Sequence, residues 1–74
     1  MEKELYDEIR TTLNIGSYAI VDVEDLGNNV LYIKTFLAQG SVGVMYTWNP
    51  RFDFETNIRF IEKRLRSHVI KMEV

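Results

Sequence analysis

Cysteine is absent from this 74-residue chain, and proline and histidine occur once each. Without cysteine there are no disulfide bridges, thiolate metal ligands or thiol nucleophiles. No apolar run approaches the ~20 residues of a membrane-spanning helix. The first nine residues, MEKELYDEI, are acidic and amphipathic, whereas a secretory signal is basic and then apolar. We therefore expect a cytoplasmic protein that contacts no membrane and forms a single domain over residues 1–74.

The residue types that carry out catalysis are scarce. His68 lies beside an apolar stripe near the C-terminus, where a packing or capping role is expected. Its neighbour Ser67 does not face it on a helix, so the two form no dyad. Asp22, Glu24 and Asp25 lack a calcium-loop spacing, and we expect them to keep a strand hydrated. Since no glycine-rich phosphate loop is present either, the sequence predicts no enzyme, no metal site and no cofactor.

Two segments have the periodicity of amphipathic helices. Residues 2–14 place Leu5, Ile9 and Leu13 four apart, and the following Asn14-Ile15-Gly16 is a stop signal. A second helix is expected from near Asp53, or alternatively from Asn49 with Pro50 in the first turn. Its apolar stripe is the strongest periodic signal in the chain and consists of Phe54, Ile58, Ile61, Leu65, Val69 and Met72. The last four residues, KMEV, either fray or add a short strand.

Three strands are expected between these helices, at residues 17–25, 30–38 and 42–48. Gly27-Asn28-Asn29 and Gln39-Gly40-Ser41 form the two connections, since glycine and asparagine tolerate positive φ. Connections this short require an antiparallel meander. The sequence therefore predicts an α+β fold of α-β-β-β-α order, with a three-stranded meander and two helices packed on one face.

Alternation along the strands divides the side chains between two faces. One face is almost entirely apolar and should carry both helices; it holds Ala19, Val21, Val23, Leu31, Ile33, Leu37, Val42, Val44, Tyr46 and Trp48. The opposite face is half apolar, and no helix remains to cover it. Its members are Tyr18, Ile20, Asp22, Glu24, Val30, Tyr32, Lys34, Phe36, Ser41, Gly43, Met45 and Thr47.

This second face is open to two interpretations. Aromatic side chains on an exposed strand stabilise a sheet through cross-strand pairing alone. A contiguous apolar patch rich in aromatics and methionine is also typical of protein interfaces. We favour a small non-enzymatic protein-binding module, an inhibitor or modulator that occludes a partner protein, of the kind phage and mobile elements encode; a structural homodimer is an alternative. The candidate protein-binding residues are Tyr18, Ile20, Tyr32, Lys34, Phe36, Met45 and Phe60.

The charge distribution raises a further alternative, nucleic-acid binding. Residues 1–28 hold seven acidic and two basic side chains, whereas residues 49–74 hold six basic and four acidic ones. A nucleic-acid-binding surface on the second helix would use Arg59, Lys63, Arg64 and Arg66. The element order also resembles that of double-stranded RNA-binding domains, which present lysines at the start of their last helix. Here that position reads RFDFETN, and Asp53 and Glu55 would repel phosphate.

Overall fold

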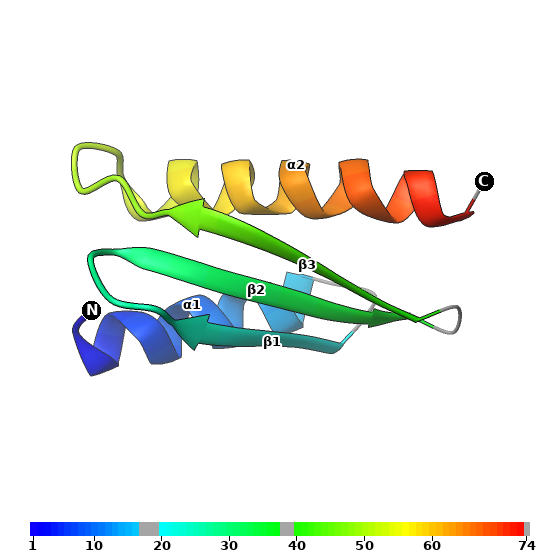
Figure 1. Cartoon of the computed structure of the whole chain (residues 1–74). Coiled ribbons are helices and arrows are strands. Elements are labelled where there is room, and N and C mark those ends of the chain that lie inside the picture. Colours follow the sequence, from blue (N-terminus) through cyan, green and yellow to red (C-terminus); the bar gives the residue numbers. More distant parts are fainter. Residues whose placement is uncertain (17–19, 38–39, 74) are drawn as a thin grey trace.

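The expected α+β architecture is confirmed in a computed structural model, which describes residues 1–16, 20–37 and 40–73, with side chains up to residue 68. The elements are α1 (Lys3–Gly16), β1 (Ile20–Asp25), β2 (Val30–Leu37), β3 (Gly40–Thr47) and α2 (Phe54–Glu73). The strands form one antiparallel sheet in the order β1-β2-β3 (Figure 1).

Some element bounds differ from those expected. Helix α1 runs two residues further than residue 14, to Gly16. Strand β3 begins at Gly40 rather than residue 42, because Leu37 and Gly40 still pair across the tight connection. Helix α2 continues to Glu73, so the alternative of a short strand within the last four residues is wrong for the three that are described.

The β1–β2 connection has the backbone that its composition predicts. Gly27, Asn28 and Asn29 all adopt left-handed conformations, with φ of 86°, 53° and 62°. The turn is closed by the Val30 N–H, which donates to the Gly27 carbonyl at 3.0 Å. Three successive left-handed residues are tolerated because glycine and asparagine have the lowest steric cost there.

Helix α2 begins after Asp53, which confirms the first of the two expected starts. The Asp53 Oδ1 accepts the Thr56 backbone N–H at 2.8 Å, an N-cap bond. Hydrogen bonding by Thr56, through its side chain and its backbone, lowers the pKa of Asp53. Asn49 instead shapes the loop before the helix, since its Oδ1 accepts the Arg51 N–H at 2.9 Å.

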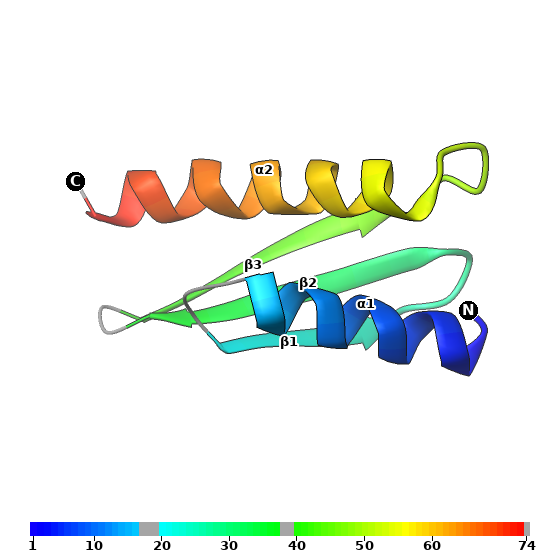
Figure 2. The ribbon, with the colours of Figure 1, turned by 180° about the vertical axis from the view of Figure 1, so that it is seen from behind.

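Both helices pack on the same face of the sheet, with α1 across the back of the strands and α2 along β3 (Figure 2). The face that α1 covers is the one predicted to be almost entirely apolar. Leu31, Ile33 and Ile61 are completely buried at the centre of the core. Thr35 is also buried on this face, although it was not among the expected core residues; its hydroxyl donates to the Ile20 carbonyl at 3.4 Å.

A buried asparagine joins α2 to the end of β3. Asn57 is fully buried, and its Oδ1 accepts the Tyr46 hydroxyl at 2.6 Å and the Asn49 N–H at 3.1 Å. Its Nδ2 donates to the carbonyls of Asn49 and Asp53. Because every polar atom of the amide is hydrogen-bonded, Asn57 fixes the first turn of α2 against the end of β3 and the loop that connects them.

Candidate protein-binding surface

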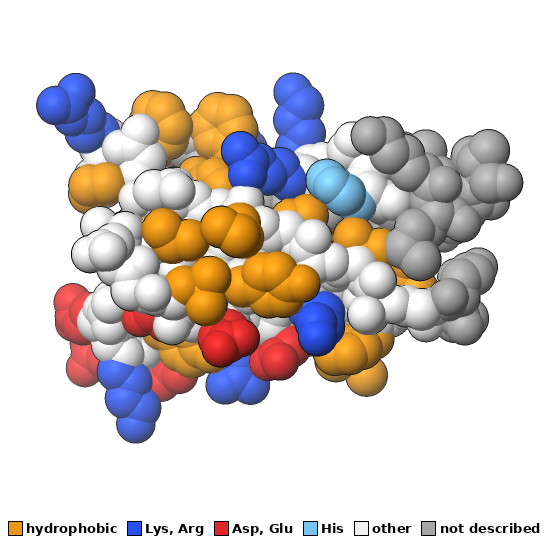
Figure 3. Space-filling view, in the orientation of Figure 1, with side chains coloured by type: hydrophobic (Ala, Val, Ile, Leu, Met, Phe, Trp, Pro, Cys, Tyr) orange, Lys and Arg blue, Asp and Glu red, His pale blue; other side chains and the backbone are white. Residues whose placement is uncertain are grey.

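The sheet face opposite the helices is exposed and carries an apolar patch at its centre (Figure 3). Strand register places Ile20 directly opposite Phe36, and Tyr32 directly opposite Met45. Ile20, Met45 and Phe36 are 72%, 57% and 48% exposed, and Tyr32 is half-buried. We call this sheet face the open face. Among the described strand residues, those predicted for the helix-covered face are buried except Leu37, which is half-buried, and none of those predicted for the open face is buried.

Tyr32 is held in place by the glycine diagonally across from it. A Cβ built on Gly43 would lie 2.1 Å from the Tyr32 hydroxyl oxygen and 2.5 Å from the ring carbon that bears it. The aromatic ring therefore covers the Gly43 backbone, in space that only glycine leaves free. This packing explains part of the aromatic character of the open face and gives the patch a fixed, flat centre.

Charged side chains border the apolar patch and also divide it, because Asp22 and Lys34 lie between the Tyr32–Met45 pair and the Ile20–Phe36 pair in the register. Asp22 and Glu24 project from β1 on the open face, and Asp22 lies opposite Lys34 in the register. The Lys34 Nζ lies 6.0 Å from the centre of the Phe36 ring. On the other side, Arg64 of α2 donates a hydrogen bond to the Met45 carbonyl. Figure 3 shows acidic side chains below the apolar band and basic ones above it, with further basic side chains beside and below the acidic ones.

Arg64 is held against the sheet by a second contact. Its guanidinium carbon lies 5.8 Å from the centre of the Tyr46 ring, a cation–π arrangement. Burial raises the pKa of the Tyr46 hydroxyl, and the nearby guanidinium offsets only part of that rise. Arg64 also lines a shallow hollow at the border of α2 and β3, together with Tyr32, Gly43, Met45, Ser67 and His68.

The outer edges of the sheet are partly covered by helix side chains. On β1, the Asn14 side chain accepts the Val21 N–H at 2.9 Å and donates to the Val21 carbonyl at 3.0 Å. The Tyr6 hydroxyl donates to the Val23 carbonyl on the same edge. On β3, the Arg64 side chain donates a hydrogen bond to the Met45 carbonyl. Strand addition at β1 is therefore disfavoured, and the open face is the more accessible surface.

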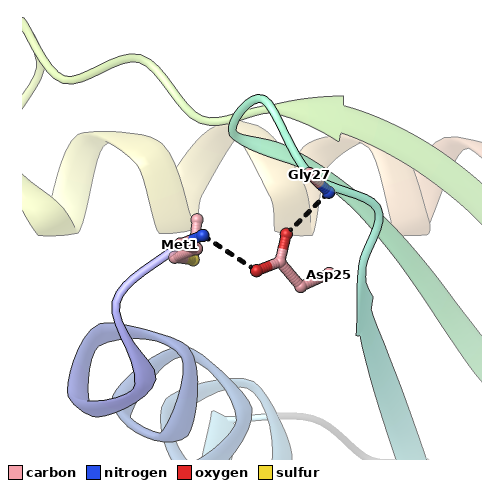
Figure 4. Close-up of polar contacts among 3 residues, drawn as sticks. All are labelled: Met1, Asp25 and Gly27. Carbon is pink, nitrogen blue, oxygen red and sulfur yellow. Dashed lines mark hydrogen bonds and ion pairs between the residues drawn. The ribbon is translucent and has the colours of Figure 1, made fainter.

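The acidic residue next to the first turn has a local structural role. Asp25 accepts the Gly27 N–H through Oδ1 at 2.9 Å, and its Oδ2 lies 3.0 Å from the Met1 amino group (Figure 4). The Gly27 hydrogen bond, followed by the amino group, lowers the pKa of Asp25. Asp25 thus fixes the turn and the start of α1, whereas Asp22 and Glu24 stay exposed on β1.

The basic residues of α2 project to different sides of the helix. Ile58, Ile61 and Leu65 face the core, and at 100° per residue Arg64 projects toward the open face. Arg59 lies on the other side, beside α1, where it lines a hollow with Thr12. Among the four candidates for nucleic-acid binding, Arg59, Lys63 and Arg66 therefore lie within about 60° of one another around the helix, whereas Arg64 is about 100° away from Lys63. Arg66 lies 4.0 Å from Glu62.

Phe60 has a neighbour that the sequence did not predict. Its ring stacks on that of Phe52 with centroids 5.6 Å apart, and the two side chains are 44% and 43% exposed. Phe52 precedes α2 in an irregular segment, so no periodicity connects it to Phe60. The pair forms a second, smaller exposed apolar cluster on the same side of α2 as Arg64.

The structure brings together most of the predicted protein-binding residues. Ile20, Tyr32, Lys34, Phe36 and Met45 share the open face, and Phe60 lies on α2. Tyr18 and Ala19 lie outside the described residues. His68 is exposed, and its Nδ1 lies 2.9 Å from the Arg64 carbonyl.

Comparisons of the chain with protein-family models, with curated proteins and with solved structures found no match. Within the described part of the chain, no helix has the length and apolarity needed to cross a bilayer. Residues 1–16, 20–37 and 40–73 also contain no group of three or more histidine, aspartate or glutamate side chains placed to hold a metal ion.

Proposed function

We propose that this chain is a cytoplasmic, non-enzymatic protein-binding module, and that the open face is its binding surface. The observation that carries the proposal is the set of four large apolar side chains on one exposed sheet face: Ile20, Tyr32, Phe36 and Met45. Exposed apolar patches are often functional on small proteins, and aromatic and methionine side chains are enriched at protein interfaces.

The mechanism that fits this surface is occlusion. The flat aromatic and methionine centre would cover an apolar site on a partner protein, and the flanking charges would set the orientation. A partner that fits has an apolar centre, a basic rim facing Asp22 and Glu24, and an acidic rim facing Arg64. An inhibitor or modulator acts in this way without chemistry of its own, as in small proteins encoded by phage and mobile elements.

Capture of partners by immobilised protein tests the proposal. Phe36→Glu and Met45→Glu each place a charge in the patch, and we expect both to abolish capture of any protein that the wild type retains from a lysate of the producing cell. Ile15→Glu is the matched control, since Ile15 is 80% exposed but lies on α1, away from the open face. Capture that survives both patch substitutions would contradict the proposal.

Stability measurements accompany this test, because a variant that unfolds also fails to bind. Phe36 and Met45 are each about half exposed, so their replacement should change the free energy of unfolding little. A large loss of stability would mean that these side chains belong to the core and not to a binding surface.

A further inference from the structure

One row of residues runs across the open face from a negative to a positive charge. Glu24, Tyr32 and Met45 lie opposite one another on the three strands. Arg64 completes the row, since its guanidinium binds the Met45 carbonyl at the outer edge of β3. The face therefore presents a carboxylate, two apolar side chains and a guanidinium in sequence.

Two copies of this row are complementary to each other when a two-fold axis parallel to the strands relates them. A two-fold axis parallel to the strands turns the face over but keeps each row at its position along the strands. Glu24 of one copy then meets Arg64 of the other, twice, and Tyr32 meets Met45, a favourable sulfur–aromatic contact. An axis perpendicular to the strands within the face would instead place each charged border against one of like sign.

We infer that one occupant of the open face is a second copy of this chain, bound across a two-fold axis parallel to the strands. The inference rests on the proposed function, because both require that the open face binds protein. Self-association would shield Tyr32 and Met45 from water until a partner protein competes for the same surface.

The size of the face sets the expected strength. The eight residues of β2 span about 27 Å, and three strands about 4.8 Å apart cover about 14 Å, which gives roughly 400 Å² per copy. Stable complexes bury about 800 Å² per partner. The dimer should therefore be weak and should dissociate on dilution.

Sedimentation equilibrium over a hundredfold range of protein concentration tests the inference. We expect the average mass to rise from 8.7 kDa toward twice that value as concentration increases. Met45→Glu should hold the mass at the monomer value throughout, whereas the control Ile15→Glu should follow the wild type. A wild-type mass that never exceeds the monomer value, or a dimer that Met45→Glu leaves intact, overturns the inference.

Charge exchange tests the axis. Glu24→Arg and Arg64→Glu each replace two attractive pairs with repulsive ones, so each variant alone should dimerise about tenfold more weakly than the wild type. An equimolar mixture of the two variants should recover the affinity, because both pairs in the mixed dimer are again attractive. Glu24 is exposed and makes none of the internal contacts of Arg64, so its variant isolates the charge effect. The proposed axis is overturned if each variant alone dimerises as strongly as the wild type, or if the mixture dimerises as weakly as each variant alone.

Failure of this inference is distinguishable from failure of the proposed function. A chain that stays monomeric, yet captures a protein that Met45→Glu loses, overturns the second copy as occupant and leaves the binding surface in place. Capture that neither Met45→Glu nor Phe36→Glu changes overturns the proposed function itself.

Discussion

Truncation of two isoleucines on opposite sides of the sheet should have very different effects on stability. Ile33 is completely buried in the core, and Ile20 is 72% exposed on the open face. Ile33→Ala removes apolar contacts and leaves a cavity, which costs about 3 kcal/mol. Ile20→Ala gives up only a small part of a side chain's burial and creates no cavity, so its cost should stay below about 1 kcal/mol.

Urea unfolding followed by circular dichroism measures both values. Small domains have an m-value of about 1 kcal/mol per molar urea, so Ile33→Ala should lower the midpoint by roughly 3 M and Ile20→Ala by less than roughly 1 M. The loss at Ile33 is a large part of the roughly 4–11 kcal/mol expected for a domain of this length. Equal losses at the two sites would refute the assignment of the faces, and with it the binding surface.

The remaining predictions concern single contacts. Asn57→Ala leaves the Tyr46 hydroxyl and the Asn49 N–H without their partner, and should lower the free energy of unfolding by about 3 kcal/mol, measured by thermal and urea unfolding. Gly43→Ala forces the Tyr32 ring to move, because the new Cβ would lie 2.1 Å from its hydroxyl oxygen; NMR shifts of that ring should change while stability changes by less than about 1 kcal/mol. Asp25 and Asp53 have folded pKa values below their ordinary value of 3.8, so their stabilising contribution is present above that pH and is lost as pH falls through the lowered pKa values. Asp25→Asn should therefore reduce the acid dependence of the unfolding midpoint between pH 5 and the acid limit, and an unchanged dependence would contradict the assigned contacts.

Local patterns were sufficient to predict the element order and the faces of the sheet. Position along each strand assigned most side chains to a face, and short glycine and asparagine connections left only an antiparallel meander. The N-cap at Asp53 and the left-handed Asn28 and Asn29 follow from residue chemistry within a few positions. These features needed no knowledge of distant contacts.

Features that depend on contacts between distant segments were not predictable in this way. Nothing in the sequence near Arg64 indicates that it binds the Met45 carbonyl, 19 residues earlier in the chain. The same holds for Asn14, which covers the β1 edge at Val21, and for the stacking of Phe52 on Phe60. The division of the α2 arginines between two sides of the helix also required the position of the helix against the sheet.

The role of the open face is most directly tested by photo-crosslinking in the cells that produce the protein. A photoreactive phenylalanine analogue in place of Met45, which is 57% exposed, would lie in the patch. The same analogue in place of Ile15, which is 80% exposed, would lie on α1, away from the open face. We predict covalent protein adducts from position 45 and none from position 15, with an adduct of twice the monomer mass identifying a second copy. Identical adducts from both positions, or none from position 45, would contradict the claim that this face binds protein.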